Sequence, residues 1–207
     1  MTRTHLSLMA WALTERGFKR IRSLIALSDF VMKNAPPDLQ VTGSDVLRAA
    51  VVLLHALMEE FVRHVAGDSL PHASADVLNG VPLVGTSRSG GKFALGALAR
   101  HRGKQVDSLL AESVREHLAG KAFGSLGAIL DMLRLSGIPI DKLRIRRAAL
   151  QGLIKRRHQI VHEGDAWPQT WRGGEKLRAI SRRQTTRWLD GVERFVGEVD
   201  RHWHLAK

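Results

Sequence analysis

The apolar residues of the chain recur with the period of an α-helix along most of its length. They return every three or four positions, which gathers them on one face of each helix. We see no run of alternating apolar and polar residues long enough for a strand, and one stretch, 67–91, is rich in glycine and proline and predicts a long loop. The helices predicted by this pattern are 4–33, 45–66, 104–119, 123–136, 141–163 and 175–203. The expected fold is therefore an all-α helical bundle with one long mid-chain loop.

The expected helix boundaries come from capping and breaking residues. Paired prolines at 36 and 37 cannot continue the first helix. Ser44 and Asp45 offer an N-cap for helix 45–66, and Asp141, shortly after Pro139, offers one for helix 141–163. At 207 residues the chain suits a single domain, 1–207. No apolar run approaches the ~18 residues of a membrane-spanning helix, so we expect a cytoplasmic protein without a membrane span.

Charge narrows the classes of partner. The chain has 32 Lys and Arg residues against 20 Asp and Glu, a formal net charge of +12. Such an excess favours a polyanion, either nucleic acid or an anionic membrane surface. The absence of cysteine excludes disulfides, thiol nucleophiles and cysteine-containing zinc motifs.

Arg157 stands out within helix 141–163. The residues three and four positions away from it are all apolar: Leu153, Ile154, Ile160 and Val161. This spacing predicts that Arg157 points into the buried face, whereas Lys155 and Arg156 lie on the solvated one. A buried guanidinium needs a compensating anion. The alternatives are an internal ion pair, with Glu59 or Glu60, and an anionic ligand.

Two histidines accompany this arginine. His158 and His162 are four residues apart, the spacing by which a helix presents two metal ligands. However, Gln159 stands where the zinc protease motif has glutamate, so we expect no metal site. Imidazole is suited to proton transfer near neutral pH, and guanidinium to charge on a phosphorane. Together they suffice for RNA cleavage by the ribose 2′-hydroxyl without a metal ion.

The segment RRHQIVHEGD resembles the HEPN ribonuclease motif, in which His follows Arg after four to six residues and a polar residue directly follows the Arg. Arg157, His158 and His162 fill these positions. Residues 44–66, SDVLRAAVVLLHALMEEFVRHVA, are similar to the family's other central helix, most of all in the branch called RiboL-PSP-HEPN. The resemblance implies a HEPN-like bundle and a metal-independent endoribonuclease without a cofactor. It also implies a homodimer with a composite active site, acting as a toxin or antiviral-defence effector beside an antitoxin or defence-system partner.

By this resemblance His162 is the catalytic acid and base, Arg157 the ligand of the phosphate, and His158 an aid in orienting them. His55 and Glu59, one turn apart on helix 45–66, either support these groups or form part of the core. Residues 141–207 hold 16 basic and 8 acidic residues, which leaves two alternatives, a track for the RNA backbone and an ordinary solvated face. The residues assigned to that track are Lys155, Arg156, Arg183, Arg187 and Arg194.

The geometry of a helix bears on the dimer. Arg157 and His162 lie about 140° apart around the axis and about 7.5 Å apart along it. We therefore expect one helix to aim these two side chains poorly at a single phosphate. Two such helices paired about a two-fold axis are expected to bring both copies of each residue around one cleft.

The alternative function, from another class, is a non-catalytic helical module that binds RNA or an acidic protein through the same basic surface.

Overall fold

The computed structural model describes residues 8–34, 36, 40–86, 95–166 and 177–203. The regular elements in these ranges are helices, and the β-pairing recorded there is one isolated bridge between Ala166 and Leu177. The predicted all-α class is confirmed. No helix in the described ranges combines the length and the apolar character that crossing a membrane requires.

The helices follow one another in a simple order. The long ones are α1 (Leu8–Asn34), α2 (Gln40–Ser69), α4 (Val106–Ala119), α5 (Leu126–Leu135), α6 (Arg147–His162) and α7 (Arg182–Trp203). The short ones are α3 (Ala75–Leu78) and the 3-10 turns η2 (Leu70–His72), η3 (Leu95–His101) and η4 (Ile140–Lys142).

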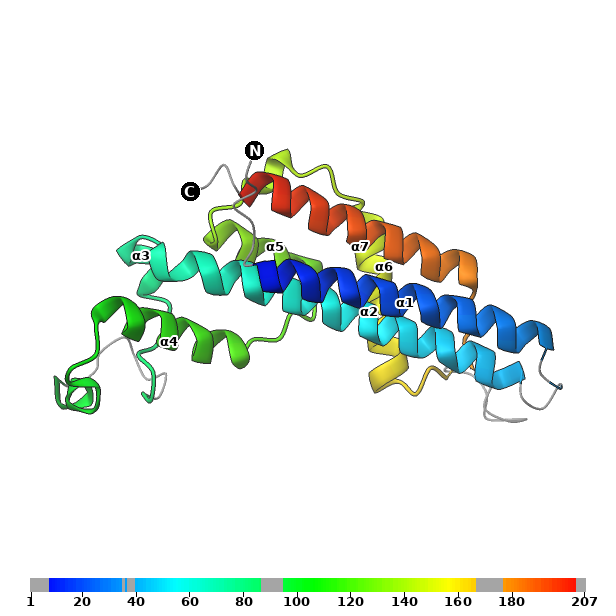
Figure 1. Ribbon diagram of the computed structural model, residues 1–207, viewed down its shortest axis with the longest axis horizontal. Helices are drawn as coiled ribbons and strands as arrows, with labels where there is room; N and C mark the ends of the chain where they lie inside the picture. Colours follow the sequence, from blue (N-terminus) through cyan, green and yellow to red (C-terminus); the bar gives the residue numbers. More distant parts are fainter. Residues whose placement is uncertain (1–7, 35, 37–39, 87–94, 167–176, 204–207) are drawn as a thin grey trace.

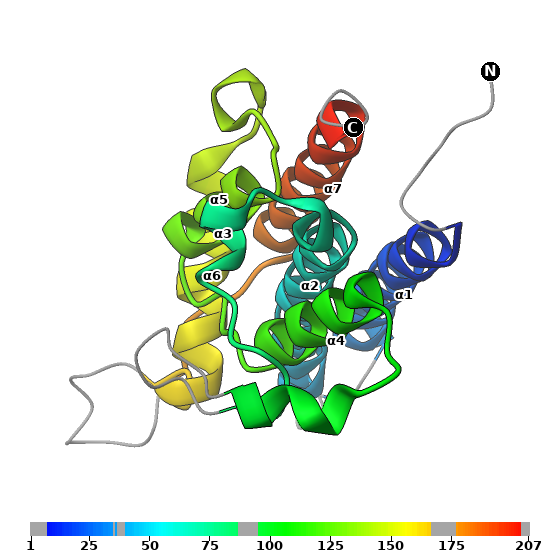
Figure 2. The same ribbon diagram turned by 90° about the vertical axis from the view of Figure 1, so that its left-hand side faces the viewer.

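Helix α2 is the centre of the bundle. It packs against α1, α4, α5, α6 and α7, and Figures 1 and 2 show it between α1 on one side and α6 on the other. Leu54, Met58 and Val62 of α2 are fully buried. Phe61 meets Phe195 of α7 edge to face, with ring centroids 6.2 Å apart. Packing against several helices explains why buried apolar residues occupy more than one face of α2, although Leu53 is 39% exposed.

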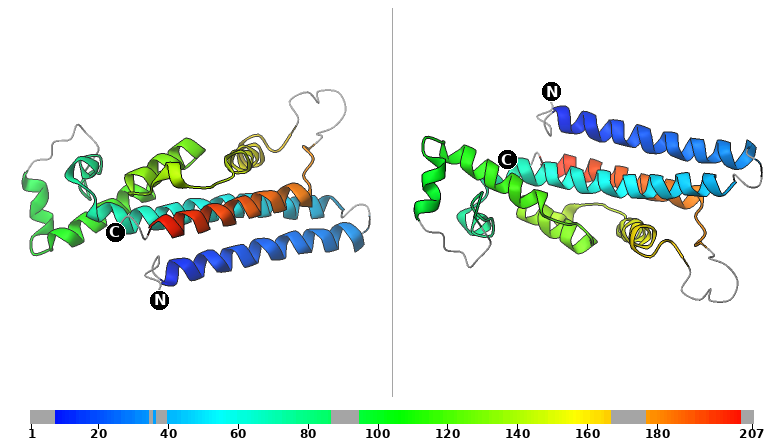
Figure 3. Two further views of the ribbon diagram at one scale, coloured as in Figure 1. Left: turned by 90° about the horizontal axis from the view of Figure 1, so that it is seen from above. Right: turned by 90° about the horizontal axis from the view of Figure 1, so that it is seen from below.

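Helix α6 has a different orientation from its neighbours. Figure 3 shows it nearly end-on, whereas α1, α2 and α7 lie lengthwise. It crosses α7 near its own start, where Gly152 lies against Trp188 and Gly191 against Ala149. Its last turns reach α2 and extend beyond it (Figure 1). The crossing leaves the C-terminal end of α6 at the edge of the bundle.

The predicted start of the second helix is wrong. Helix α2 begins at Gln40, a full turn before the expected cap at Ser44 and Asp45. Gly43 explains the extension, because a residue without a side chain lets this turn approach α1 closely. Ser28 donates a hydrogen bond to the carbonyl of Gly43 at 2.7 Å. Asp45 pairs with Arg48 at 3.1 Å.

The predicted loop 67–91 is partly helical. Helix α2 continues to Ser69, and η2 and α3 follow within the stretch that we expected to be irregular. Residues 87–91 lie outside the described ranges. The glycine and proline content therefore marked a series of short turns rather than one uninterrupted loop.

Helix α6 begins later than its sequence predicts, at Arg147 rather than near Asp141. The backbone of Arg144 is bound by two side chains of α7: its N–H donates to Glu198 at 2.9 Å, and its carbonyl accepts from Arg194 at 2.8 Å. These contacts hold the chain out of the helix, and Leu143 is buried there. Asp141 lies in η4 and does not cap α6.

The last helix also starts later, at Arg182 instead of 175. Leu177 pairs with Ala166 in the β-bridge, and Ser181 then begins the helix, with its hydroxyl accepting from the N–H of Gln184 at 3.3 Å. Residues 175 and 176 of the predicted helix lie outside the described ranges.

Candidate functional site

The three residues of the Arg–His motif meet at the free end of α6. Arg157 Nη1 lies 3.0 Å from His162 Nε2, and the rings of His158 and His162 have centroids 4.8 Å apart. Both histidines are exposed and Arg157 is half-buried. A guanidinium and two imidazoles thus form one cluster that a ligand can reach.

This geometry corrects one step of the sequence argument. We expected the helical offset of Arg157 and His162 to aim them poorly at one phosphate, but their side chains bend toward each other and touch. The length of the arginine side chain covers the offset along the axis. Geometry within one chain therefore no longer argues for a site shared between two chains.

The expected burial of Arg157 is also wrong, because the buried arginine of α6 is its neighbour. Arg156 is 7% exposed, although the pattern placed it on the solvated face. Val161, expected in the core, is 46% exposed. The last turn of α6 projects beyond α2, so its apolar side is not covered, and the chain after it folds back over Arg156. Arg156 is therefore not available to bind the RNA backbone.

Asp165 is the partner of Arg156. Its carboxylate is almost fully buried, and Oδ2 accepts from Arg156 Nη2 at 2.8 Å and from Arg48 Nε of α2 at 2.5 Å. Oδ1 lies 2.5 Å from Arg156 Nη1, a close ionic contact without the alignment of a hydrogen bond. Burial lowers the pKa of Arg156, and the charge of Asp165 opposes that effect. One of the alternatives for Arg157 was an internal ion pair. The arginine of α6 that forms such a pair is Arg156, with Asp165.

The acidic residues proposed to pair with Arg157 bind other groups. Glu59 Oε1 accepts from the N–H of Phe123 at 3.1 Å, and Oε2 lies 3.7 Å from His55 Nδ1. Glu60 lies 3.5 Å from Arg63 and 3.3 Å from His64. Glu59 therefore fixes the chain that leads into α5.

His55 is a core histidine beside the motif. It is 2% exposed, and neither ring nitrogen makes a hydrogen bond within the described part of the chain. Burial lowers its pKa, Glu59 opposes this, and the charges of Arg157 and Arg63 lower the pKa further. Burial thus favours the neutral form of the ring, and the charge of Arg157 acts in the same direction.

A cavity adjoins the motif on the side of α5. It has a volume of about 520 Å³, and its lining includes the apolar side chains of Leu126 and Ile154 and the polar side chains of Lys155 and His158. The remaining lining residues are Gly124, Ser125, Gly127, Gln151, Gln159 and Glu163. Lys155, assigned from the sequence to the RNA backbone, is exposed here. The cavity offers apolar surface and hydrogen-bonding groups next to an exposed imidazole.

The arginines of α7 lie at a distance from this cluster. Arg183, Arg187 and Arg194 are exposed, as an outward-facing track requires. However, α6 crosses α7 at Gly152, and by the rise of a helix His162 lies about 15 Å further along α6. Figure 1 shows α7 and the end of α6 on different sides of α2. The sequence predicted the exposure of these residues and not their separation from the motif.

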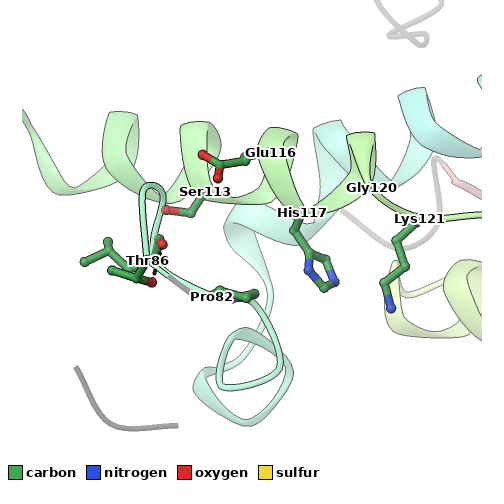
Figure 4. Close-up of a pocket in the computed structure, with 8 residues that line it drawn as sticks. Pro82, Thr86, Ser113, Glu116, His117, Gly120 and Lys121 are labelled. Carbon is green, nitrogen blue, oxygen red and sulfur yellow. Dashed lines mark hydrogen bonds between the residues drawn. The ribbon is translucent and has the colours of Figure 1, made fainter. Parts of the chain in front are cut away.

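Another pocket, of about 230 Å³, lies between α4 and the turn around Thr86. Figure 4 shows Ser113 and Thr86 at one end of it, and His117 and Lys121 at the other. The Ser113 hydroxyl donates to the carbonyl of Leu109 at 2.8 Å and accepts from the N–H of Val84 at 3.0 Å. Ser113 therefore holds the turn on α4 and is not prepared as a nucleophile.

In the described part of the chain, no group of three or more metal-ligating side chains lies close enough to hold a metal ion. Comparisons of the chain with models of known families, with curated proteins and with solved structures found no match. Sequence reasoning missed the ion pairs of Asp165 with Arg48 and Arg156, and it missed Arg178 as a neighbour of the motif. The one signal for Asp165 was its place after Gly164, where a helix is expected to end.

Proposed function

We propose that this chain is a metal-independent endoribonuclease of the HEPN type. The observation that carries the proposal is the contact of 3.0 Å between Arg157 Nη1 and His162 Nε2 at the exposed end of α6. A cationic group and a titratable ring in contact can neutralise a phosphate oxygen and move a proton at the same centre. The resemblance of residues 44–66 and 156–165 to that family supports the same reaction.

In the proposed reaction the ribose 2′-oxygen attacks the adjacent phosphorus while a base takes its proton. The bond from phosphorus to the 5′-oxygen breaks, and that oxygen receives a proton. The products are a 2′,3′-cyclic phosphate and a 5′-hydroxyl. His162 transfers the protons, Arg157 stabilises the charge of the phosphorane, and His158, whose ring lies tilted against that of His162, orients it.

The proposal includes a homodimer whose two α6 ends share one cleft, and this part rests on the family resemblance. A mixture of Arg157→Ala and His162→Ala chains, each inactive alone, tests it. If subunits exchange and the cleft is shared, heterodimers regain part of the activity. A protein that stays monomeric by light scattering at every concentration contradicts this part.

The direct test of the reaction uses purified protein, mixed RNAs and a chelator of divalent ions. We expect cleavage to persist and the fragments to carry 2′,3′-cyclic phosphate ends, detected as phosphates that phosphatase removes only after mild acid opens the ring. The matched controls are His64→Ala, a histidine of α2 paired with Glu60, and Arg134→Ala, an arginine of α5 paired with Asp131. Binding of RNA without cleavage supports the alternative, a non-catalytic module.

The biological role proposed with this activity is that of a toxin or antiviral-defence effector held in check by a partner. Expression of the unaltered chain should then arrest the growth of a host cell, and His162→Ala should abolish the arrest at equal protein levels. Growth arrest that persists in His162→Ala contradicts a role based on RNA cleavage.

A further inference from the structure

We infer that Asp165, held by Arg48 and Arg156, is a positioning residue for His162. The inference rests on the proposed function, since it names what holds the proton-transferring side chain in place. Arg156 immediately precedes the first residue of the motif, and Asp165 lies three residues after the last. Their ion pair therefore brackets the motif on both sides.

The path of the chain after His162 explains why such a device is needed. His162 is the last residue of α6 and is exposed, and the final turn of a helix frays easily. Gly164 and Asp165 both have φ of +60°, which reverses the chain at once. This conformation is unfavourable for a residue with a side chain, and Asp tolerates it better than most.

Hydrogen bonds show how closely this reversal is tied to the helix end. The N–H groups of Glu163 and Asp165 both donate to the carbonyl of Gln159, at 3.2 and 2.9 Å. The turn thus satisfies a carbonyl that the helix would otherwise leave open. His162 lies between Gln159 and Glu163, so its backbone is fixed when these bonds form.

The side chain of Asp165 adds a tie to a second helix. Arg48 reaches it from α2, and Arg48 and Arg156 both donate to the carbonyl of Arg178 at 3.0 Å. Arg178 in turn donates its N–H to the carbonyl of Asp165 at 2.8 Å and its guanidinium to Glu163 at 2.9 Å. The end of α6 is therefore joined to α2 and to the returning chain mainly by charged groups.

The variant Asp165→Asn removes the charge of the side chain and keeps its shape. Asparagine has nearly the same volume and also tolerates a positive φ, so the turn itself is not the target. We expect kcat to fall about 10- to 100-fold with little change in KM, because a displacement of about 1 Å at a catalytic group can cost 10²-fold. In a His162→Ala background the same change should cause a much smaller further loss.

Glu198→Gln is the matched control, because Glu198 is also a buried carboxylate that binds an arginine and a backbone N–H, but at the start of α6. It should lower stability and leave kcat within about twofold of the unaltered protein. If Asp165→Asn does not fold, Arg48→Gln takes its place, because it keeps the Arg156–Asp165 pair and should give a smaller loss in the same direction. Equal kcat for folded Asp165→Asn and the unaltered protein overturns the inference.

Amide hydrogen exchange provides a measurement that needs no activity. In Asp165→Asn the N–H of Glu163 should exchange at least about tenfold faster. The exchange rates of amides in the middle of α6 should change only as far as the global stability changes. If the unaltered chain does not cleave RNA, the proposed function fails, and this exchange still decides whether the ion pair orders the helix end. Unchanged exchange at Glu163 overturns the positioning role.

Discussion

The two ends of α6 are held by different forces. At its start, Leu143 and Leu150 are buried, and Glu198 and Arg194 of α7 bind the backbone of Arg144. At its end, ion pairs to Asp165 replace apolar contacts, and polar side chains face outward. The first arrangement favours stability, whereas the second fixes a helix end and still leaves His158 and His162 exposed.

The comparison explains where chemistry is feasible on this helix. In the first region Leu143 and Leu150 are enclosed by the core, and the histidines of the motif lie at the other end of the helix. In the second region Arg48 and Arg156 hold the buried carboxylate of Asp165 and so fix the backbone. The exposed side chains there can therefore be the histidines of the motif. Four changes test this division, from the largest expected effect to the smallest.

The largest effect is expected for His162→Ala. Loss of a general acid–base group costs about 10²- to 10⁴-fold in rate. Because His162 is exposed and contacts Arg157 rather than the core, the free energy of unfolding should stay within about 0.5 kcal/mol of the unaltered value. Steady-state cleavage of a labelled RNA and urea denaturation measure the two quantities. A folded His162→Ala protein with full activity removes this residue from the mechanism.

The second effect is a contrast between Arg157→Leu and Arg156→Leu, which should differ in their effects on activity and stability. Arg157→Leu should abolish cleavage and leave stability equal or higher, because this guanidinium is half-buried and, within the described part of the chain, its hydrogen-bond partner is the exposed His162. Arg156→Leu leaves Asp165 buried with one partner fewer, and removal of one partner of a buried pair costs about 3–5 kcal/mol. Urea denaturation of both proteins checks the contrast. Equal stability losses contradict the assignment of Arg156 as the structural residue.

The third effect is a dependence of stability on pH that originates in His55. Its pKa is lowered in the folded protein by burial and by Arg157 and Arg63, against the opposing charge of Glu59. The unfolded chain therefore binds a proton more readily below pH ~6.5, so stability is full above that pH and falls as the pH drops. One proton limits the slope to about 1.4 kcal/mol per pH unit.

His55→Leu should remove this component, so the difference in unfolding free energy between pH 7.5 and 5 becomes smaller. His64→Leu, at a half-buried position of the same helix, is the control and should keep it. Urea titrations of the three proteins at both pH values give the comparison. An identical pH dependence in His55→Leu shows that His55 is not the group that titrates.

The smallest effect concerns the basic side chains. Lys155 lines the cavity beside His158, whereas Arg187 lies on α7, away from the end of α6. Loss of one phosphate contact lowers the salt dependence of RNA binding by about one unit of slope. We expect Lys155→Ala to raise KM several-fold more than Arg187→Ala at low salt. The reverse order supports a track along α7.

Burial along α6 follows the apolar period in the middle of the helix but not at its end. The apolar period correctly predicted burial of Leu150, Leu153 and Ile154, because these residues lie where other helices cover them. It failed at Arg156 and Val161, since a helical wheel does not show where a helix leaves the bundle or that the chain folds back at Gly164. It also missed the late start of α6, which is due to side chains of Glu198 and Arg194, some 50 residues away.

The candidate site shows the same division between local and distant information. The motif residues are within five positions of one another, so the sequence alone indicated that they belong to one site, although the helical offset did not predict the contact of Arg157 with His162. Arg48 is 117 residues from Asp165, and no local pattern connects them. The cavity beside His158 likewise depends on how α5 docks on α6, a contact that helical periodicity does not encode.

The pairing of Arg48 with Asp165 also has a consequence for synthesis of the chain. A ribosome makes α1 and α2 before α6, and these two helices can pair as a local hairpin before α6 is added. Both partners of Arg48, Asp165 and the carbonyl of Arg178, are added more than a hundred residues later. The end of α6 therefore reaches its final order only after the chain has been made through Arg178. A nascent chain in which α1 and α2 already pair thus still lacks the fixed helix end.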